Sequence, residues 1–154
     1  MKWLFVFMTT FLFMEFSAWA LHRYVMHGFL WILHEDHHVP HQHKFEKNDL
    51  FSLFYAVPSF LSILFDHLFK LPFLGAFGYG ILAYGFAYFF VHEVIIHRRL
   101  KFISLKKNWY FRALNMAHKV HHSNQRKEDG KNFGMLIVPM EYYKKSIQMK
   151  KINI

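Results

Sequence analysis

Ten of the thirteen histidines in this 154-residue chain fall into two copies of one spacing pattern. In each copy, a pair of histidines separated by four residues precedes a triplet spaced His-x2-His-His. The copies consist of His22, His27, His34, His37 and His38, and of His92, His97, His118, His121 and His122. Because order and spacing are shared, we interpret the ten side chains as one chemical device and predict that they bind metal.

The triplets suit metal ligation if they lie on helices. At about 100° per residue, the three imidazoles of a triplet lie within an arc of about 100°. The pairs are harder to place, because rings five residues apart lie about 140° from each other on an α-helix. Each pair therefore needs a local π-helical distortion, or its two histidines bind different metals. The sequence leaves both alternatives open.

The number and type of ligands favour two metal ions. The chain has no cysteine, which excludes thiolate sites, disulfides and cysteine nucleophiles. Ten imidazoles exceed the four ligands of a structural zinc site and are too many for one octahedral ion. Two ions with about five ligands each fit better and leave positions open for a small molecule. Imidazole binds iron, zinc, copper and nickel, so ligand type alone does not identify the metal.

A metal-bound imidazole usually donates its second N–H to a carboxylate or a carbonyl. The carboxylates inside the histidine blocks are the candidates for this role, namely Glu35, Asp36, Glu93 and Asp129. For Glu35 and Asp129, an ordinary solvated charge is equally open. His41 and His43 are either spare ligands or loop residues, and we favour the loop. His67 lies in a predicted turn on the opposite side and is not expected to bind metal.

Other catalytic templates do not occur. The sequence has no Gly-rich phosphate loop, no Gly-x-Ser-x-Gly elbow and no His-Glu-x-x-His zinc-protease motif. We therefore predict no catalytic residues beyond the metal ligands.

Three long apolar segments must position the histidine blocks. Residues 3–21, 50–66 and 71–91 have the length and composition of membrane-spanning helices, and the last two form a tight hairpin in which glycines permit close contacts. The first segment could be a signal peptide, but it lacks a small-x-small cleavage pattern, so an uncleaved anchor is favoured. Glu15 within it is costly in lipid and should face other helices or a cavity. A soluble bundle is disfavoured because the segments lack polar faces.

The distribution of charge predicts the topology. The polar blocks, residues 22–49 and 92–154, lie on the same side of the membrane. Fourteen of the nineteen Lys and Arg residues follow His92, which places both blocks in the cytoplasm by the positive-inside rule. The net charge of +9 therefore does not indicate a nucleic-acid partner. Residues 133–143 are too short to span and are expected to rest on the membrane surface.

These expectations combine into a single all-α domain covering residues 1–154. It is an integral membrane helical bundle of about three to four membrane helices, with a cytoplasmic histidine-rich dimetal site. Such a site, at the surface of an apolar body, predicts an apolar substrate that arrives laterally from the lipid. Acid–base groups cannot attack an unactivated C–H bond, whereas an iron pair that binds dioxygen can.

The double histidine pattern resembles that of the fatty acid hydroxylase and sterol desaturase superfamily. The surrounding residues are similar, more narrowly, to the bacterial β-carotene 3-hydroxylases. The similarity covers about residues 10 to 140, and the matching stretches are "HRYVMHGFLWILHEDHH" (22–38), "FEKNDLF" (45–51), "YGFAYFFVHEVIIHRR" (84–99), "RALNMAHKVHHSNQRKED" (112–129) and "FGML" (133–136).

The resemblance implies a non-haem di-iron monooxygenase whose iron ligands are the ten histidines. It would hydroxylate carbon 3 of the β-ionone rings of β-carotene, giving β-cryptoxanthin and zeaxanthin. Dioxygen would be the co-substrate, a ferredoxin-type protein would donate electrons, and the carotenoid would come from the lipids of the bacterial inner membrane. Two stretches depart from the family pattern, "RRLK" (98–101) and the charged "RKEDGKN" (126–132). We expect them to affect the range of carotenoids, including keto-carotenoids, without touching the ligands.

Three alternatives stay open. Within the superfamily, the chain could be a fatty-acid or lipid hydroxylase or desaturase. A membrane metal carrier is disfavoured, because transporters place their ligands inside helices at the bilayer midplane. A bis-histidine haem protein would show a Soret band in its visible spectrum.

Overall fold

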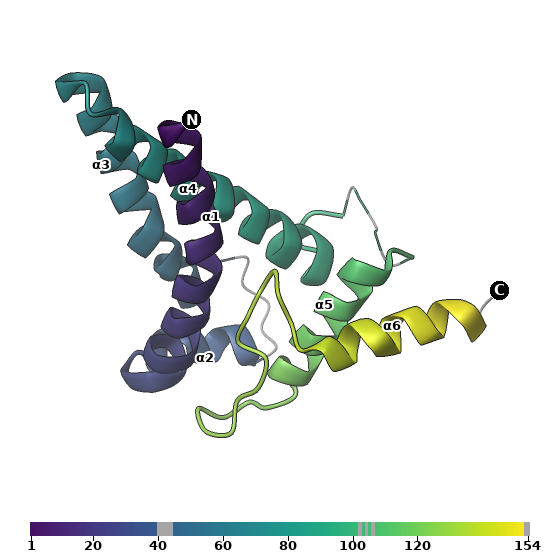
Figure 1. Cartoon of the computed structure of the whole chain (residues 1–154). Coiled ribbons are helices and arrows are strands. Elements are labelled where there is room, and N and C mark those ends of the chain that lie inside the picture. Colours follow the sequence, from purple (N-terminus) through teal and green to yellow (C-terminus); the bar gives the residue numbers. More distant parts are fainter. Residues whose placement is uncertain (40–44, 102, 104, 106, 153–154) are drawn as a thin grey trace.

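The computed structural model describes residues 1–39, 45–101, 103, 105 and 107–152, and the regular elements within these ranges are all helical. This confirms the predicted all-α class, whereas His41 and His43 lie outside the described residues. The elements are α1 (Lys2–Ala20), η1 (Leu21–Phe29), α2 (Trp31–His38), η2 (Lys47–Ser52), α3 (Leu53–Phe69), α4 (Pro72–Phe89), η3 (Phe90–Ile96), α5 (Trp109–His122) and α6 (Met140–Ile152) (Figure 1).

Three helical stretches in the described part of the chain are long and apolar enough to cross a membrane: Lys2–Phe29, Lys47–Phe69 and Pro72–Ile96. They confirm the three predicted membrane segments. All three run past their predicted C-terminal ends. The extension is longest in the first and third, because α1 continues into η1 and α4 continues into η3 without a break. Large apolar side chains such as Phe13 and Phe60 are exposed on these helices, as expected of surfaces that face lipid.

The α3–α4 hairpin is closed by a turn in which Lys70 adopts a left-handed conformation (φ 58°). As the sequence predicted, glycines let the helices approach closely. A side chain at Gly78 would collide with the backbone of Ser59, whose hydroxyl donates to the Gly78 carbonyl at 2.8 Å. Gly80 lies in the same way against Thr10 of α1. The three membrane helices therefore form one packed unit (Figure 1).

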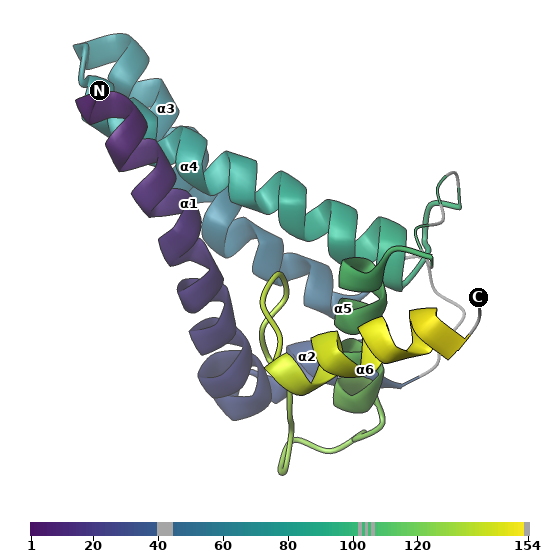
Figure 2. The same cartoon turned by 45° about the vertical axis from the view of Figure 1, so that its right-hand side comes forward.

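Helices α5 and α6 lie at the end of this unit that is remote from the α3–α4 turn (Figures 1 and 2). The α5 helix is capped by Asn108, whose side-chain oxygen accepts the N–H of Tyr110 at 2.9 Å. The α5–α6 contact is fixed by Ser146, which donates to the carbonyl of Trp109 at 2.7 Å and accepts from Arg112 at 2.9 Å.

Part of the segment 133–143 is buried against protein, a contact that the sequence analysis did not predict, whereas Ile137 and Met140 are exposed. Met135, Val138 and Tyr142 are buried in a core that they share with Val91 and residues of α5. The segment forms a loop that rises beside α1 and then leads into α6 (Figure 2).

Candidate metal centre

The histidine pairs lie on π-helices. Hydrogen bonds from residue i to i+5 bring side chains five positions apart onto one face. The η1 helix carries His22 and His27, whose ring centroids are 5.3 Å apart. The η3 helix carries His92, and the N–H of His97 donates to its carbonyl at 2.9 Å, leaving the two rings 4.4 Å apart. Of the two alternatives left open by the spacing, the structure therefore contains the helical distortion.

The ten predicted ligands gather into two adjacent groups at the end of the molecule that is remote from the α3–α4 turn. In each group, one side-chain nitrogen per residue can be chosen so that all lie within 4.8 Å of one another. The first group contains His22, His27, His34, His38 and His121, and the second contains His37, His97, His118 and His122. His92 adjoins the second group, because its Nε2 lies 3.1 Å from that of His37.

The groups do not follow the order of the sequence. His37 and His121 are the middle residues of their triplets, and each belongs to the group built mainly from the other half of the chain. The two halves are therefore interlocked, and neither histidine block forms a group alone.

The spacing between the nitrogens fits a coordination shell. For metal–nitrogen bonds of about 2.1 Å, neighbouring ligands of an octahedral ion are about 3.0 Å apart. The observed Nε2–Nε2 distances are 3.1, 3.1, 3.1 and 2.9 Å for the pairs His22–His34, His34–His38, His37–His92 and His97–His118.

Tautomers make this arrangement specific for a cation. His34 donates its Nδ1–H to Asn48 Oδ1 at 2.7 Å, and His22 donates its Nδ1–H to the carbonyl of Phe133 at 3.0 Å. With both Nδ1 atoms protonated, the facing Nε2 atoms carry lone pairs directed toward each other. Burial lowers the pKa of His34 to about 2, so a shared proton does not relieve this repulsion near pH 7. A metal ion held by His22 and His34 would relieve it.

Backbone carbonyls orient four of the five histidines in the first group. The acceptors for Nδ1 all belong to residues 124–133, which follow α5. They are the carbonyls of Phe133 for His22 (3.0 Å), Lys127 for His27 (3.2 Å), Asn124 for His38 (2.9 Å) and Lys131 for His121 (2.8 Å). The stretch "RKEDGKN" therefore does touch the candidate ligands, and our expectation that it would not was wrong.

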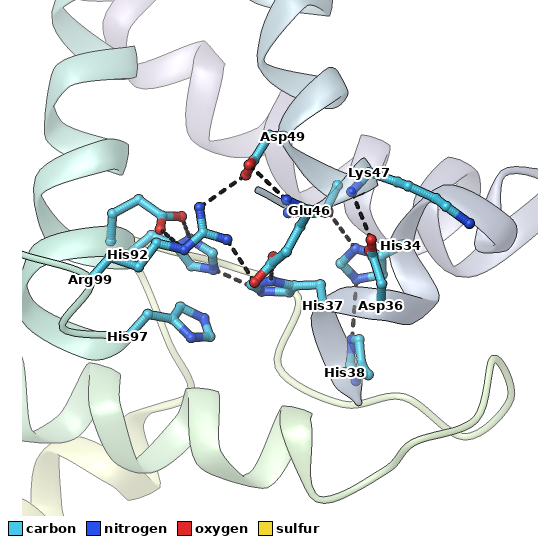
Figure 3. A network of polar contacts seen from close by, with 12 residues as sticks. His34, Asp36, His37, His38, Glu46, Lys47, Asp49, His92, His97 and Arg99 are labelled. Atoms are coloured by element: carbon cyan, nitrogen blue, oxygen red, sulfur yellow. Dashed lines mark hydrogen bonds and ion pairs between the residues drawn. The ribbon is translucent and has the colours of Figure 1, made fainter. Parts of the chain in front are cut away.

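Carboxylates orient histidines of the second group. His37 donates its Nδ1–H to Glu46 at 2.6 Å, and His92 donates its Nδ1–H to Glu93 at 2.5 Å (Figure 3). Burial lowers the pKa of His37 well below its ordinary value, and the neighbouring histidines lower it further. The imidazole is therefore neutral and free to bind metal through Nε2.

Arg99 joins the two carboxylates. Its guanidinium forms ion pairs with Glu46 (2.6 Å), Glu93 (2.9 Å) and Asp49 (3.1 Å) (Figure 3). Arg99 belongs to the "RRLK" departure from the family pattern, so this stretch also acts on the candidate ligands through one intervening residue. Arg99 itself contacts no histidine, as we expected of this stretch.

The predicted orienting carboxylates have different surroundings. Glu93 contacts a histidine, as expected. Glu35 and Asp129 are exposed, and Asp36 accepts the backbone N–H of Lys47 at 2.7 Å instead (Figure 3). Glu35 and Asp36 follow His34 on α2 and lie on other faces of that helix, so they cannot reach the imidazoles behind it.

Sequence reasoning missed Glu46 and Asn48. Both lie in "FEKNDLF", which carried part of the family resemblance but contains no histidine. Glu46 precedes η2, whose capping box pairs Glu46 with Asp49. His67 lies in the last turn of α3. This end of α3 is remote from α2 and α5, which carry both histidine triplets, as predicted (Figure 1).

The family model that matches this chain and three of its relatives are all named as hydroxylases. The family model described as fatty acid hydroxylase matches residues 7–144. A β-carotene hydroxylase of Paracoccus sp. (strain PC1) is 37% identical over 132 residues, covering 84% of this chain and 80% of the relative. A β-carotene hydroxylase of Pantoea ananas is 38% identical, covering 82% of this chain and 71% of the relative. No solved structure matches.

A chloroplastic relative extends this similarity to plants. Beta-carotene hydroxylase 1 of Capsicum annuum is 40% identical over 132 residues, which cover 83% of this chain but 41% of the longer relative.

Proposed function

The chain belongs to the fatty acid hydroxylase family, and we propose that it hydroxylates carbon 3 of the β-ionone rings of β-carotene, giving β-cryptoxanthin and then zeaxanthin. The observation that carries this proposal is the pair of largely buried histidine groups whose Nε2 lone pairs converge. The carotenoid assignment is supported by relatives that bear the name β-carotene hydroxylase and match most of both chains.

The histidine groups would hold two iron ions, one per group, with His92 completing the second. When bound, iron would supply the activation of dioxygen that attack on an unactivated C–H bond requires. The overall reaction consumes one C–H bond, one dioxygen, two electrons and two protons, and yields one C–OH group and one water. A ferredoxin-type protein is proposed as the source of the electrons.

The protein's own side chains contribute position and protonation state. Burial lowers the pKa of His121 to about 3 and that of His122 to about 2, so these two imidazoles are neutral near pH 7. Where the Nδ1–H of a histidine is held by an acceptor, the ring presents its Nε2 to the other histidines of its group. Buried ligands also exclude bulk water from the reacting atoms.

Delivery of an apolar substrate follows from the apolar helices. The exposed Phe and Leu side chains of α1, α3 and α4 provide a surface that lipid would cover, and a carotenoid dissolved in that lipid would reach the histidine end by lateral diffusion. The excess of Lys and Arg after His92 supports a cytoplasmic position for the histidines.

Co-expression with enzymes that make β-carotene tests the substrate. We expect the cells to accumulate hydroxylated carotenoids, with a variant carrying His121→Ala as the inactive comparison. If β-carotene is unchanged while membrane fatty acids gain hydroxyl groups or double bonds, the alternative of a lipid hydroxylase or desaturase replaces the carotenoid proposal.

Metal analysis tests the centre separately. The purified full chain, prepared with ample iron, should contain close to two iron atoms and show no Soret band. One metal or none would overturn the dimetal proposal, and a Soret band would indicate a haem protein.

A further inference from the structure

Glu15 places a carboxylate inside the first membrane-spanning helix, where an acidic group needs partners. Its Oε1 accepts the backbone N–H groups of Met135 (3.0 Å), Leu136 (3.0 Å) and Ile137 (2.9 Å). Its Oε2 accepts the hydroxyl of Tyr84 at 2.6 Å and lies 3.1 Å from the Leu136 nitrogen. All four donors are uncharged N–H or O–H groups, and together they surround the carboxylate.

The three N–H groups belong to the loop between α5 and α6, and their hydrogen bonds to Glu15 hold this loop beside α1 (Figure 2). The turn is tight, since a side chain at Gly134 would collide with the carbonyl oxygen of Ile137 and lie 3.3 Å from Glu15 Oε1. A carboxylate fits these donors because it is purely an acceptor. An amide in its place would direct an NH2 group at one of the donors.

The same loop reaches the first histidine group. Phe133, two residues before Met135, accepts the Nδ1–H of His22 through its carbonyl. Its ring lies with its centroid 5.3 Å from that of His22 and 5.1 Å from that of His27. Lys131, two residues earlier, accepts the Nδ1–H of His121.

The loop thus joins two points on one continuous helix. Glu15 and His22 are seven residues apart, which is about two helical turns and places them on a common face. The loop contacts α1 at Glu15 and contacts the start of η1 at His22. Releasing the Glu15 contact would free the loop end that carries the Phe133 carbonyl.

We propose that Glu15 is a positioning residue of the first histidine group. Its carboxylate holds the α5–α6 loop against α1, and the loop in turn orients His22, His27 and His121. The inference rests on the proposed function only in taking the histidine groups as metal sites.

The test compares Glu15→Gln with Ser17→Ala in the full chain. Ser17 is a matched control, since it also makes a polar contact from α1, with Tyr55 at 2.9 Å, but does not touch the loop. We measure bound iron per chain and its removal by a chelator. Glu15→Gln should weaken one of the two metals about 10–100-fold, as loss of outer hydrogen-bond partners does, whereas Ser17→Ala should retain both.

Gly134→Ala tests the contact from the loop side and should weaken the same single metal. Wild-type retention of both metals in Glu15→Gln would overturn the inference. So would equal loss of both metals with reduced helicity, because that result indicates a general folding role.

Amide hydrogen exchange gives a readout that does not need metal. In Glu15→Gln the amides of Met135, Leu136 and Ile137 should exchange faster than in Ser17→Ala, and unchanged exchange would contradict the proposal. The wild-type chain could bind two metals, and Glu15→Gln could show these changes, while the wild-type chain does not hydroxylate β-carotene. In that case the proposed function fails and the positioning role stands.

Discussion

The two histidine groups hold the same kind of ligand by different means. In the first group the Nδ1 acceptors are four backbone carbonyls and the Asn48 amide, all neutral. In the second they include Glu46 and Glu93, which Arg99 holds together. A carboxylate acceptor makes the imidazole a stronger electron donor than a carbonyl does. The second group is therefore suited to bind its ion more tightly, whereas the first depends on the conformation of one loop.

The largest expected effect comes from the exchanged histidines. His121→Ala should empty the first group, although His121 lies in the second histidine block, and His37→Ala should empty the second group. Each should retain about one metal per chain and lose hydroxylation at least about 100-fold, because an imidazole ligand is missing. The variants are loaded with cobalt, and metal analysis gives the number of ions bound per chain. The visible spectrum of the bound cobalt checks which of the two groups is empty.

The control for this prediction is His67→Ala, which changes a histidine at the far end of α3. It should bind two metals and keep wild-type activity. If His67→Ala were as damaging as His121→Ala, the assignment of the two groups would be wrong.

A smaller effect is expected when a carboxylate acceptor of the second group is neutralised. Glu46→Gln keeps the size of the side chain but removes the charge that faces His37 and Arg99. We expect the metal of the second group to bind about 10–100-fold more weakly, with the first group unchanged. Chelator competition measures both affinities. Glu35→Gln, an exposed carboxylate on α2, is the matched control, and equal losses in both variants would remove the distinction between the groups.

Periodicity predicted the three membrane helices and the hairpin, because these follow from local chain geometry. The duplicated spacing pattern predicted that the ten histidines lie together. The π-helical distortion was one of two alternatives. The sequence could not decide between them, because the distortion depends on the two histidines of each pair facing the same group in the folded chain. The exchange of His37 and His121 could not be predicted, since it is set by how α2 and α5 pack against each other. The acceptors were missed for the same reason: a backbone carbonyl carries no residue-type signal, and Glu46 reaches His37 only through the fold.

Removing Arg99 should have a weaker effect than removing either carboxylate. Its side chain is 28% exposed and touches no histidine, so water can replace part of its contact with Glu46 and Glu93. Arg99→Gln should reduce the affinity of the second metal by a few-fold. Arg99→Lys should recover only part of the loss, because a single ammonium cannot contact both carboxylates in the way that a guanidinium does. Isothermal titration with cobalt measures the change, and a weakened first metal would contradict it.

The smallest effect follows directly from the contrast between carbonyl and carboxylate acceptors. Lys127 and Lys131 each orient a histidine of the first group, but through the backbone, while their side chains are exposed. Lys127→Ala and Lys131→Ala keep the carbonyl in place, so metal affinity and hydroxylation should stay within about twofold of wild type, the range expected for exposed surface substitutions. Insertion of one glycine after Lys127 shifts the carbonyls without removing a side chain, and it should weaken the first metal alone. If the two alanine variants lost metal and the insertion did not, the first group would depend on lysine side chains and the contrast between the groups would fail.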